Sequence, residues 1–448
     1  MAQAAEREAP LGDNLRTLDH TQEISYVHHK NISGAGAMLR VLISGAGIGG
    51  LTAALHLARR GFEVEVFEAA PEIRELGLGI NIQPHGVREL VAIGLEDAIA
   101  RGSCAVAKLA YFNKHGQEIW HEPRGRDAGY RYQQAAINRG RLQGMLLEAA
   151  SAALGGDRIH AGHRLERFEQ SDNQVILHFA AGPDGQRPAP RRGDILVGAD
   201  GIHSVVRKSF YPNEGLPKFG GQIMWRGISR VRPFFDGRTM IMAGHRDKKV
   251  VVYPVDAGVG DDGLINVNWV AEDTITDSMP PREDWNREAS VPGVAARFVD
   301  WRFPWLDVPA VLAAAPTCYE FPKVDRDPVA QWSFGRVTLL GDAAHPMHPA
   351  GSNGATQAII DAPALADSLV ADSDPVAALR TYQDKRLPVL AELVRINREK
   401  MGPESVMILA EQRAPNGFTN VLDVLTQEEL DSASNAYKTA VGAERARG

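Results

Sequence analysis

The sequence predicts an α/β fold with a parallel sheet, an inserted and mostly antiparallel sheet, and C-terminal helices. Three observations predict it. A glycine-rich turn joins a buried strand to a helix near residue 45, two long segments alternate polar and apolar residues, and the last part has a helical period. With 448 residues the chain is too long for one ordinary core, so two or three lobes are expected.

The first elements form a βαβ unit of the Rossmann-like type. The run LRVLIS at 39–44 has the composition of a strand that is buried on both faces. The turn GAGIGG at 45–50 follows, and the segment 51–61 then has one apolar helical face and ends in a glycine. A second strand at 63–69 contains Glu68 near its end. The unit is about thirty residues long, as expected for βαβ.

The chain then leaves this domain twice and returns. Residues alternate over 106–134 and 221–271, where NKHG at 113–116 predicts a hairpin turn. Buried-strand character returns at 194–201 and 336–343. The expected boundaries are a disordered extension at 1–37, a Rossmann-like domain at 38–105, 135–215 and 324–405, an inserted domain at 106–134 and 216–323, and a helical tail at 406–448.

Composition excludes several classes of protein. The formal net charge is −7 and no basic stripe is present, so nucleic acid is not an expected partner. The two cysteines, Cys104 and Cys318, lack metal or disulfide spacing, which favours a reducing cytoplasm. We expect no membrane span, because no apolar run reaches about 18–20 residues. We also expect no secretory signal, because residues 1–37 lack the charged-then-apolar layout of one.

The turn at 45–50 has the spacing of a dinucleotide site. Gly45 permits the tight turn, Gly47 lets backbone amides approach a pyrophosphate, and Gly50 lets the helix pack against the strand. Glu68 follows 18 residues after Gly50 and is placed to accept hydrogen bonds from a ribose diol. These residues leave NAD and FAD open as ligands.

Two further strand ends favour FAD. Asp200 and Gly201 end one strand, and Gly341 and Asp342 end another. A nicotinamide dehydrogenase needs no second, distant aspartate, whereas the ribityl hydroxyls of FAD need an acceptor such as Asp342. The glycine-rich segment 351–354 opens a helix, whose amides and dipole would stabilise negative charge on a reduced flavin ring.

Together these motifs resemble the single-component flavoprotein aromatic hydroxylases. The resemblance rests on GxGxxG with its strand-end glutamate, on ADG, and on GDAAHxxxPxxG, and it covers about 38–401. The segments GLGINIQP, MWRG, DGRTMI and FPKVDRDP look closest to the phenazine-carboxylate hydroxylases. INRGRLQGMLLEAA matches the segment whose arginine, here Arg139, approaches FAD. Ser352 and Asn353 depart from the Gly-Gln that is frequent in the family, so side-chain contacts do not transfer there.

The resemblance implies a cofactor, a reaction and a set of residues. FAD is reduced by transient NADH or NADPH, reacts with O2 to a C4a-hydroperoxide, and hydroxylates an aromatic or heteroaromatic acid, with or without decarboxylation. A homodimer fits the family. A flavin oxidase or dehydrogenase, a salicylate- or hydroxybenzoate-type hydroxylase and a flavin-binding regulator remain alternatives. The expected FAD-binding residues are Gly45, Gly47, Ile48, Gly49, Gly50, Glu68, Arg139, Asp200, Gly341, Asp342, Pro349, Gly351, Ser352, Asn353 and Gly354.

Four residues of the inserted sheet are candidates for the substrate pocket. Arg226 would anchor a carboxylate by a bidentate pair or form an interdomain salt bridge, and both interpretations stay open. Met224, Trp225 and Tyr253 would line an aromatic pocket or belong to an ordinary core.

Two further expectations concern Pro346 and Pro349 of the segment GDAAHPMHPAG. By the family pattern, Pro346 would pack along the flavin edge. Asp342, His345 and His348 resemble an iron site, but Pro346 and Pro349 interrupt the segment, so no metal is expected. We assign no catalytic side chain, because the flavin carries this chemistry.

Overall fold

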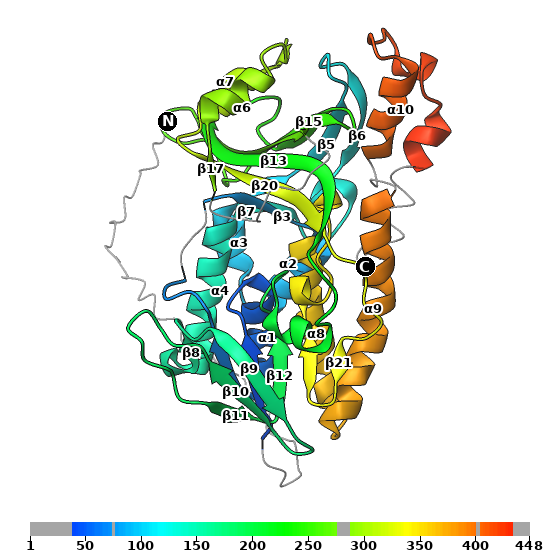
Figure 1. The fold of residues 1–448 in the computed structure, drawn as a ribbon. Coiled ribbons are helices and arrows are strands. Elements are labelled where there is room, and N and C mark those ends of the chain that lie inside the picture. Colours follow the sequence, from blue (N-terminus) through cyan, green and yellow to red (C-terminus); the bar gives the residue numbers. More distant parts are fainter. Residues whose placement is uncertain (1–37, 74–76, 276–286, 400–403, 433–448) are drawn as a thin grey trace, which may run out of the picture. The chain divides into compact units, whose positions relative to one another are not determined.

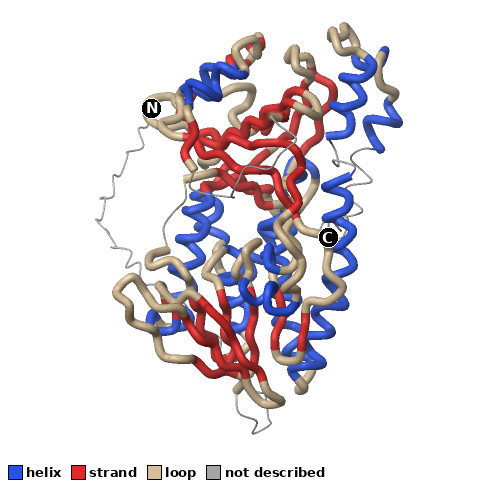
Figure 2. Tube along the Cα trace, in the orientation of Figure 1, coloured by secondary structure: helices blue, strands red, loops and turns tan. Residues whose placement is uncertain are grey.

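The computed structural model describes residues 38–73, 77–275, 287–399 and 404–432 (Figure 1). The extension expected at 1–37 lies outside these residues, as does the end of the helical tail. Within the described chain, Figure 2 shows two regions rich in strands, with helices between and beside them.

A six-stranded sheet is the centre of the first domain. Its order is β21-β22-β12-β1-β2-β8, and all neighbours are parallel except β21 and β22. The strands are β1 (Arg40–Ser44), β2 (Glu63–Phe67), β8 (Ile159–His160), β12 (Ile195–Gly198), β21 (Ser333–Phe334) and β22 (Val337–Leu339). Val41, Leu42 and Ile43 are completely buried, as a strand covered on both faces requires.

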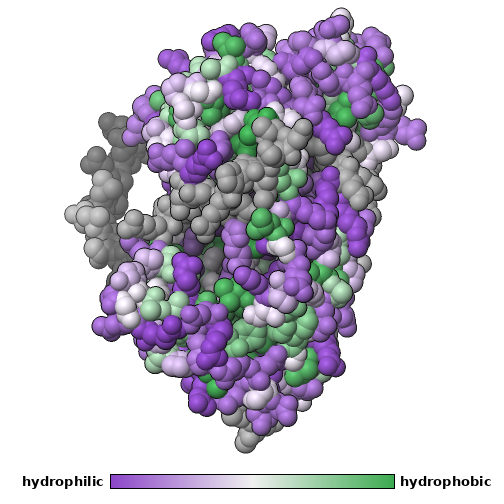
Figure 3. Space-filling model, viewed as in Figure 1, coloured by the Kyte–Doolittle hydropathy of each residue, from purple (hydrophilic) through white to green (hydrophobic). Residues whose placement is uncertain are grey.

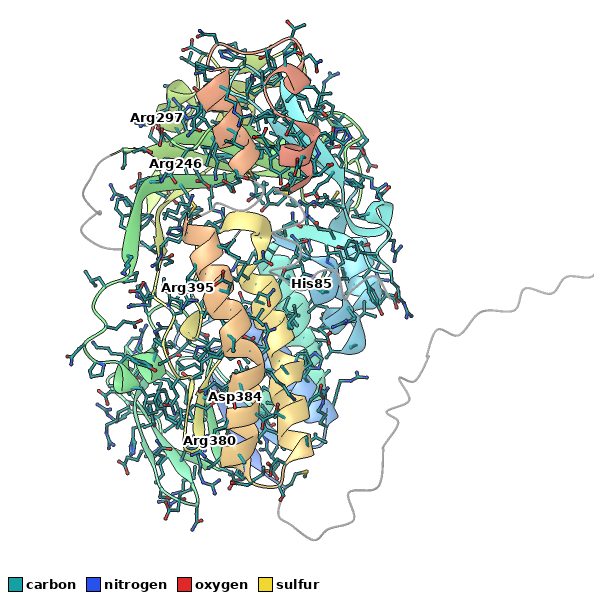
Figure 4. All side chains as sticks on the ribbon, turned by 90° about the vertical axis from the view of Figure 1, so that its right-hand side faces the viewer. His85, Arg246, Arg297, Arg380, Asp384 and Arg395 are labelled. Carbon is teal, nitrogen blue, oxygen red and sulfur yellow. The ribbon has the colours of Figure 1, made fainter. Side chains whose placement is uncertain are left out.

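Helices pack against this sheet and against one another. α1 (Ile48–Arg59) contacts α4 (Arg139–Leu154) and α8 (Gly354–Ala371), and α8 contacts α9 (Pro375–Glu399). The helices predicted at 51–61 and from 375 to about 400 are thereby confirmed. Figure 4 shows Arg380, Asp384 and Arg395 along α9, and all three are exposed, so this face of the long helix meets solvent.

Smaller elements surround the first domain. One three-stranded sheet has the order β3-β7-β4, and another has the order β11-β10-β9. The strands and the short helices are β3 (Gly79–Ile82), β4 (Ser103–Val106), β7 (Gln134–Asn138), β9 (Leu165–Gln170), β10 (Val175–Phe179), β11 (Arg191–Gly193), α2 (Pro84–Ala92), α3 (Glu96–Gly102) and α5 (Val205–Phe210).

An eight-stranded sheet forms the second region. Its order is β17-β20-β13-β16-β15-β14-β5-β6, and only β14 and β5 are parallel. The strands are β5 (Lys108–Phe112), β6 (Glu118–Pro123), β13 (Lys218–Val231), β14 (Thr239–Gly244), β15 (Lys248–Pro254), β16 (Ile265–Thr274), β17 (Glu288–Ala289) and β20 (Cys318–Asp325). The turn predicted at 113–116 joins β5 and β6. The mixed parallel and antiparallel architecture confirms the predicted fold class.

The two faces of the large sheet have different neighbours. One face packs against α6 (Val291–Arg297) and α7 (Val308–Ala313) in a core that includes Trp225 and Trp269. The hairpin of β18 (Arg302–Phe303) and β19 (Leu306–Asp307) joins this core. The other face is turned toward β3 and β7, and α10 (Ser405–Arg413) packs beside β6.

Among the coloured atoms of the face shown in Figure 3, hydrophilic residues predominate, and apolar residues form smaller areas between them. The large apolar side chains that are exposed, such as Leu216, Phe235 and Leu422, come from distant parts of the described chain. Among the helices of the described ranges, none combines the length and the apolar character that a membrane crossing needs.

Candidate active site

The turn after β1 has room for glycine alone at two positions. Gly45 has a φ of +109°, and a Cβ on it would lie 2.4 Å from the carbonyl oxygen of Ala199. A Cβ on Gly50 would lie 2.0 Å from the carbonyl oxygen of Gly45. A Cβ on Gly47 would meet no atom within 4 Å. The first two glycines therefore let the turn close, whereas the third leaves space in front of the helix, where a pyrophosphate would lie.

Glu68, which directly follows β2, is tied to the same turn. Its Oε2 accepts a hydrogen bond of 2.9 Å from the amide of Ala46, and its Oε1 accepts one of 2.8 Å from the amide of Ala70. Each carboxylate oxygen has a second lone pair, so the residue can hold the turn and still accept from a ribose hydroxyl.

The loop after β22 is held by a buried ionic network. Asp361 of α8 accepts hydrogen bonds from the amide of Gly341 at 3.1 Å and from Nε of Arg386 at 2.8 Å, and its Oδ2 lies 2.6 Å from Nε2 of His345. Gly341 has a φ of +62°, which favours glycine. This network fixes the turn that presents Asp342. It also gives His345 a structural role.

The pKa values of the two aspartates near this turn are shifted in opposite directions. Burial alone would raise the pKa of Asp361, but the charges and hydrogen bonds of His345 and Arg386 lower it to about 2. Burial raises the pKa of Asp342, although His345 and Arg139 oppose that shift. The Asp342 side chain is accessible through the cavity that it lines. It is therefore a carboxylate surrounded by protein and open on the side where ribityl hydroxyls would approach.

The segment 349–354 forms the next part of the wall. Gly351 has a φ of +62° and Ser352 one of +56°, so this loop folds back on itself before α8 begins at Gly354. Nε2 of Gln83 donates a hydrogen bond of 3.1 Å to the Gly351 carbonyl. A glycine-containing loop that precedes an 18-residue helix is suited to hold a flavin ring with its backbone amides.

These segments meet the large sheet at a cavity of about 410 Å³. That volume lies within the range of ordinary ligand sites. Eleven of the residues predicted to bind FAD line it: Gly47, Ile48, Gly49, Arg139, Gly341, Asp342, Pro349, Gly351, Ser352, Asn353 and Gly354. The cavity therefore joins three distant stretches of sequence at one place.

The other predicted FAD residues lie behind this wall. Gly45, Gly50 and Glu68 shape the turn, as described above. The Asp200 side chain accepts hydrogen bonds from Oγ of Ser204, the N-cap residue of α5, at 2.5 Å and from the amide of Val205 at 2.8 Å, so it holds the start of that helix. Its neighbours Ala199 and Gly201 line the cavity.

Two arginines face each other across the boundary of the two regions. The guanidinium of Arg226 donates a hydrogen bond of 2.7 Å to the Gly79 carbonyl, and its Nε is buried without a partner in the described chain. The interdomain contact of Arg226 is thus a bond to backbone and not a salt bridge. Burial and the like charge of Arg226 lower the pKa of Arg139, which Asp342 partly offsets. An anion would stabilise this pair of cations.

The residues of the large sheet that were candidates for the substrate pocket lie on two different faces of their strands. Met224 and Tyr253 line the cavity with Arg226. Trp225 lies on the opposite face, in the core against α6 and α7, where its Nε1 donates to Glu320 at 2.9 Å. Trp225 is therefore a core residue, because neighbours along a strand point to opposite faces. Pro346 is buried and does not line the cavity, whereas Pro349 does.

Sequence reasoning missed a buried charge cluster on the cavity wall. Lys249 pairs with Glu404 and, at 3.4 Å, with Glu272, which also pairs with Lys323 at 3.1 Å. Burial would raise the pKa of Glu272, but the two lysines hold it well below the usual range. Lys249 and Val251 are two residues apart on β15 and therefore lie on the same face of the strand. A lysine on a face that also carries apolar residues was the signal in the sequence for this cluster. Across the described ranges, no three His, Cys, Asp or Glu side chains converge as a metal would require.

Comparisons with known proteins agree with this geometry. The family profile described as FAD binding domain matches residues 38–285 and 309–397. The chain is 43% identical over 366 residues to the phenazine 1,6-dicarboxylic acid hydroxylase PhzS of Lysobacter antibioticus, covering 80% of this chain and 89% of that protein. It is 31% identical over 374 residues to the 6-hydroxynicotinate 3-monooxygenase of Bordetella bronchiseptica, covering 80% and 91%.

Solved structures share the fold. HpxO of Klebsiella pneumoniae, in complex with FAD and uric acid, has a TM-score of 0.68 at 22% identity and covers 93% of this chain and 97% of that chain. CtdE, in complex with FAD and a substrate, has a TM-score of 0.69 at 20% identity and covers 91% and 100%. With FAD as its cofactor, the chain belongs to the FAD binding domain family and is a flavin-dependent aromatic hydroxylase.

Proposed function

We propose that the chain hydroxylates a planar, fused-ring aromatic carboxylic acid of the phenazine type. The observation that carries this proposal is a continuous floor on the cavity face of the large sheet, which begins at a buried arginine and runs beneath the space beside the flavin loop. The name of the 43% identical relative supports the same class of substrate.

The floor follows one row of paired residues across five strands. Arg226 of β13 pairs with Val270, Val270 with Val251, Val251 with Met242, and Met242 with Tyr111 of β5. We call Val270, Val251, Met242 and Tyr111 the apolar floor. Strands lie about 4.8 Å apart, so the three steps from β13 to β14 span about 14 Å. A flat apolar row of this length fits a fused ring system better than a single ring.

Arg226 supplies the polar anchor at one end of the apolar floor. One of its terminal nitrogens is used by Gly79, while the buried Nε lacks a partner in the described part of the chain. The Arg226 guanidinium also lies near the Tyr253 hydroxyl, whose pKa burial raises and Arg226 partly lowers again. A substrate carboxylate would satisfy the free donor with a charge-assisted hydrogen bond.

The residues present fit FAD on the other side of the cavity. The open space at Gly47 would take the pyrophosphate, Asp342 would accept from the ribityl chain, and the loop 351–354 would face the ring. Bound FAD, after reduction by NADH or NADPH, supplies the activation of O2 from which one oxygen atom enters the substrate. The chain itself orients the acid through Arg226, and the apolar floor keeps water away from the reacting ring.

A substrate screen tests the proposed function. The purified yellow protein is mixed with NADH or NADPH and with aromatic acids of one, two or three rings, and nicotinamide oxidation and product mass are measured under labelled O2. We expect the fused-ring acids to give the highest kcat/KM, with one labelled oxygen atom in the product. A product without the label would indicate an oxidase or dehydrogenase, and nicotinamide oxidation that no acid stimulates would contradict the proposal.

A substitution of Arg226 tests the anchor. Arg226→Met keeps most of the side-chain volume but removes the charge. We expect KM for the acid to rise by about tenfold to a hundredfold, because hydrogen bonds to charged groups are worth about 1.5–3 kcal/mol. Flavin content should stay unchanged, and an unchanged KM would remove Arg226 from the substrate site.

We also propose that the protein works in the cytoplasm. Cys104 and Cys318 are both free and buried, and burial raises the pKa of Cys104 to about 12, so this thiol is unreactive. Fractionation of the producing cells, with the protein detected by antibody, tests this location.

A further inference from the structure

Besides Arg226, the cavity carries a second group of polar side chains. Asn81 lies on β3, Gln134 begins β7, and Arg124 directly follows β6, the last strand of the large sheet. All three line the cavity. Asn81 is 3% exposed and Gln134 is 2% exposed, so these polar groups lie deep within the protein. We call Asn81, Arg124 and Gln134 the distal subsite.

Strand pairing brings the three residues together. Asn81 pairs with Ala136 of β7, and Gln134 lies two residues before Ala136, so it points to the same face as a diagonal neighbour of Asn81. A Cβ on Gly125 would lie 2.5 Å from the amide nitrogen of Gln134, which places the residue next to Arg124 against the same strand.

Each member of the distal subsite has a buried polar atom without a partner in the described chain. These atoms are Oδ1 of Asn81, Oε1 of Gln134 and Nε of Arg124. A buried polar atom that lacks a hydrogen bond costs about 1–3 kcal/mol, and such atoms are few in native proteins. Three of them on one wall of a cavity indicate a ligand group that would pair with them.

The distal subsite can supply donors from all three side chains. The Asn81 amide nitrogen makes only a contact of 3.1 Å with the sulfur of Met240, which is a weak acceptor. Rotation of the carboxamide by 180° therefore sacrifices little and turns its N–H groups to the ligand, and the same rotation is open to Gln134. Arg124 forms an ion pair with Glu122, so the subsite has one cation that is already balanced.

The position of the distal subsite suits a second substituent on the ring system. Arg226 lies at one end of the apolar floor, and β6, which Arg124 follows, lies beyond β5 at the other end. The amide of Arg124 bonds the Ala107 carbonyl, four residues before Tyr111, so Arg124 is displaced along the strands from the apolar floor. Asn81 lies two residues after Gly79, whose carbonyl accepts from Arg226. A planar acid held by Arg226 would therefore extend a substituent of its far ring diagonally, toward Asn81 and Gln134. Of the carboxylates that line the cavity, Asp342 belongs to the FAD side, and Glu272 and Glu404 are paired with lysines and do not oppose a second acid group.

We propose that the distal subsite binds a second carboxyl-type group of the substrate, a carboxylate or a carboxamide. Its oxygen atoms accept from Nε of Arg124 and from the amide groups of Gln134 and Asn81. The inference rests on the proposed function and sharpens it, because it selects fused-ring acids that carry polar groups at both ends.

Binding measurements on the FAD-loaded protein test the distal subsite. Phenazine-1-carboxylate, phenazine-1,6-dicarboxylate and the monoamide of the diacid are titrated by calorimetry. We expect the diacid or its monoamide to bind about tenfold or more tightly than the monoacid, since one charge-assisted hydrogen bond has about that effect. Comparison of diacid with monoamide shows which form of the group the subsite takes.

Two variants and a matched control test whether the distal subsite causes the preference for a second carboxyl-type group. Gln134→Leu should abolish the tenfold ratio while leaving monoacid binding within about twofold, and Arg124→Lys, which keeps the charge beside Glu122, should reduce the ratio. Gln133→Leu makes the same change one residue earlier, where the side chain bonds Ser103 and does not line the cavity, and should preserve the ratio.

The outcomes separate this inference from the proposed function. If the monoacid binds and the second group adds nothing, the distal subsite is wrong and the proposed function stands. If Gln134→Leu and Arg124→Lys keep the wild-type ratio, the subsite is wrong as well. If neither acid binds the wild-type protein, both proposals fall together.

Discussion

The part of the cavity that faces FAD is built mainly from backbone, whereas the part beneath the large sheet is built from side chains. On the FAD side, glycines and tight turns remove side chains so that amide groups can reach a ligand, as at Gly47 and in the loop 351–354. On the sheet side, one residue from each of several strands projects into the cavity, as at Met242, Val251 and Val270.

Charge is also handled differently on the two sides. Asp342 stands alone at the cavity surface, and burial raises its pKa, so its ionised form costs the folded protein stability until a ligand pairs with it. Beneath the sheet, Lys249, Lys323, Glu272 and Glu404 neutralise one another within the protein. We conclude that the charge of Asp342 depends on the cofactor for stabilisation, whereas the four charges of the buried cluster balance one another within the protein.

The largest expected effect separates two glycines of the same turn. Gly50→Ala would place a methyl group 2.0 Å from the Gly45 carbonyl oxygen, so backbone must shift, and we expect the protein not to fold, a loss above about 5 kcal/mol. Gly47→Ala meets no protein atom within 4 Å, so stability of the flavin-depleted protein should change by less than about 0.5 kcal/mol.

Gly47→Ala should weaken FAD binding although it leaves the stability of the fold nearly unchanged. Its methyl group would occupy the space assigned to the pyrophosphate, so we expect FAD affinity to fall by at least about tenfold. Urea unfolding gives the stability, and titration of the flavin-depleted protein with FAD gives the affinity. Wild-type FAD affinity in Gly47→Ala would contradict the placement of the pyrophosphate.

The next effect breaks the charge balance beneath the sheet. Lys249→Met leaves Glu404 without its partner and Glu272 with Lys323 alone, so we expect a loss of about 3–5 kcal/mol in the free energy of unfolding. Adding Glu404→Gln should restore part of it, because one unpaired charge is then removed.

A neighbouring lysine provides the control for Lys249. Lys248 is partly exposed and lies 4.0 Å from Asp273. The same change there, Lys248→Met, should cost about 1 kcal/mol or less. Urea unfolding gives the free energy of unfolding of each variant. Equal losses at positions 248 and 249 would show that the buried cluster contributes no more to stability than an exposed ion pair does.

The difference between backbone and side chains decides what the sequence could predict. The glycines at 45, 47 and 50 serve a turn whose geometry is local, so their spacing with Glu68 indicated a dinucleotide site. Asp342 could be placed for the same reason, because it follows a buried strand directly. The parallel sheet and the inserted sheet were likewise predictable, since their strands carry different periodicities along the chain.

The sheet side was less predictable because it depends on pairing between distant strands. Asn81, Arg124 and Gln134 come from three elements and meet only through the register of β3 with β7 and the path after β6. A register shift of one residue would turn each side chain to the other face. Alternation likewise indicates that Met224 and Trp225 point apart, but not which of them faces the cavity.

A smaller effect tests the stability cost at Asp342. Because burial raises its pKa in the folded state, the folded protein holds this proton more tightly than the unfolded chain does. Stability therefore falls as pH rises through that range, and Asp342→Asn should remove the loss. We expect flavin-depleted Asp342→Asn to match the wild type below the ordinary aspartate pKa of about 3.9 and to be modestly more stable at neutral pH.

FAD retention should move in the opposite direction. The carboxamide of Asp342→Asn lacks the negative charge that accepts from ribityl hydroxyls, so the purified variant should contain less flavin than the wild type. Thermal unfolding between about pH 3 and 8 and the flavin absorbance of the purified protein measure the two properties. A variant that is less stable at neutral pH, or that stays fully yellow, would contradict the role assigned to this residue.

The smallest expected effect concerns the face of β13 that is turned away from the cavity. Trp225→Phe keeps an aromatic ring in the core but removes the hydrogen bond of 2.9 Å to Glu320, so we expect a loss of about 1 kcal/mol. Ligand binding should not change, because Trp225 does not line the cavity, whereas Met224→Ala, one residue earlier, should weaken binding of the aromatic acid. Calorimetric titration of both variants distinguishes the two faces. If Trp225→Phe weakened the acid as much as Met224→Ala did, ligand recognition would extend through the sheet into its core, and the separation of a ligand-binding face from a structural face would be wrong.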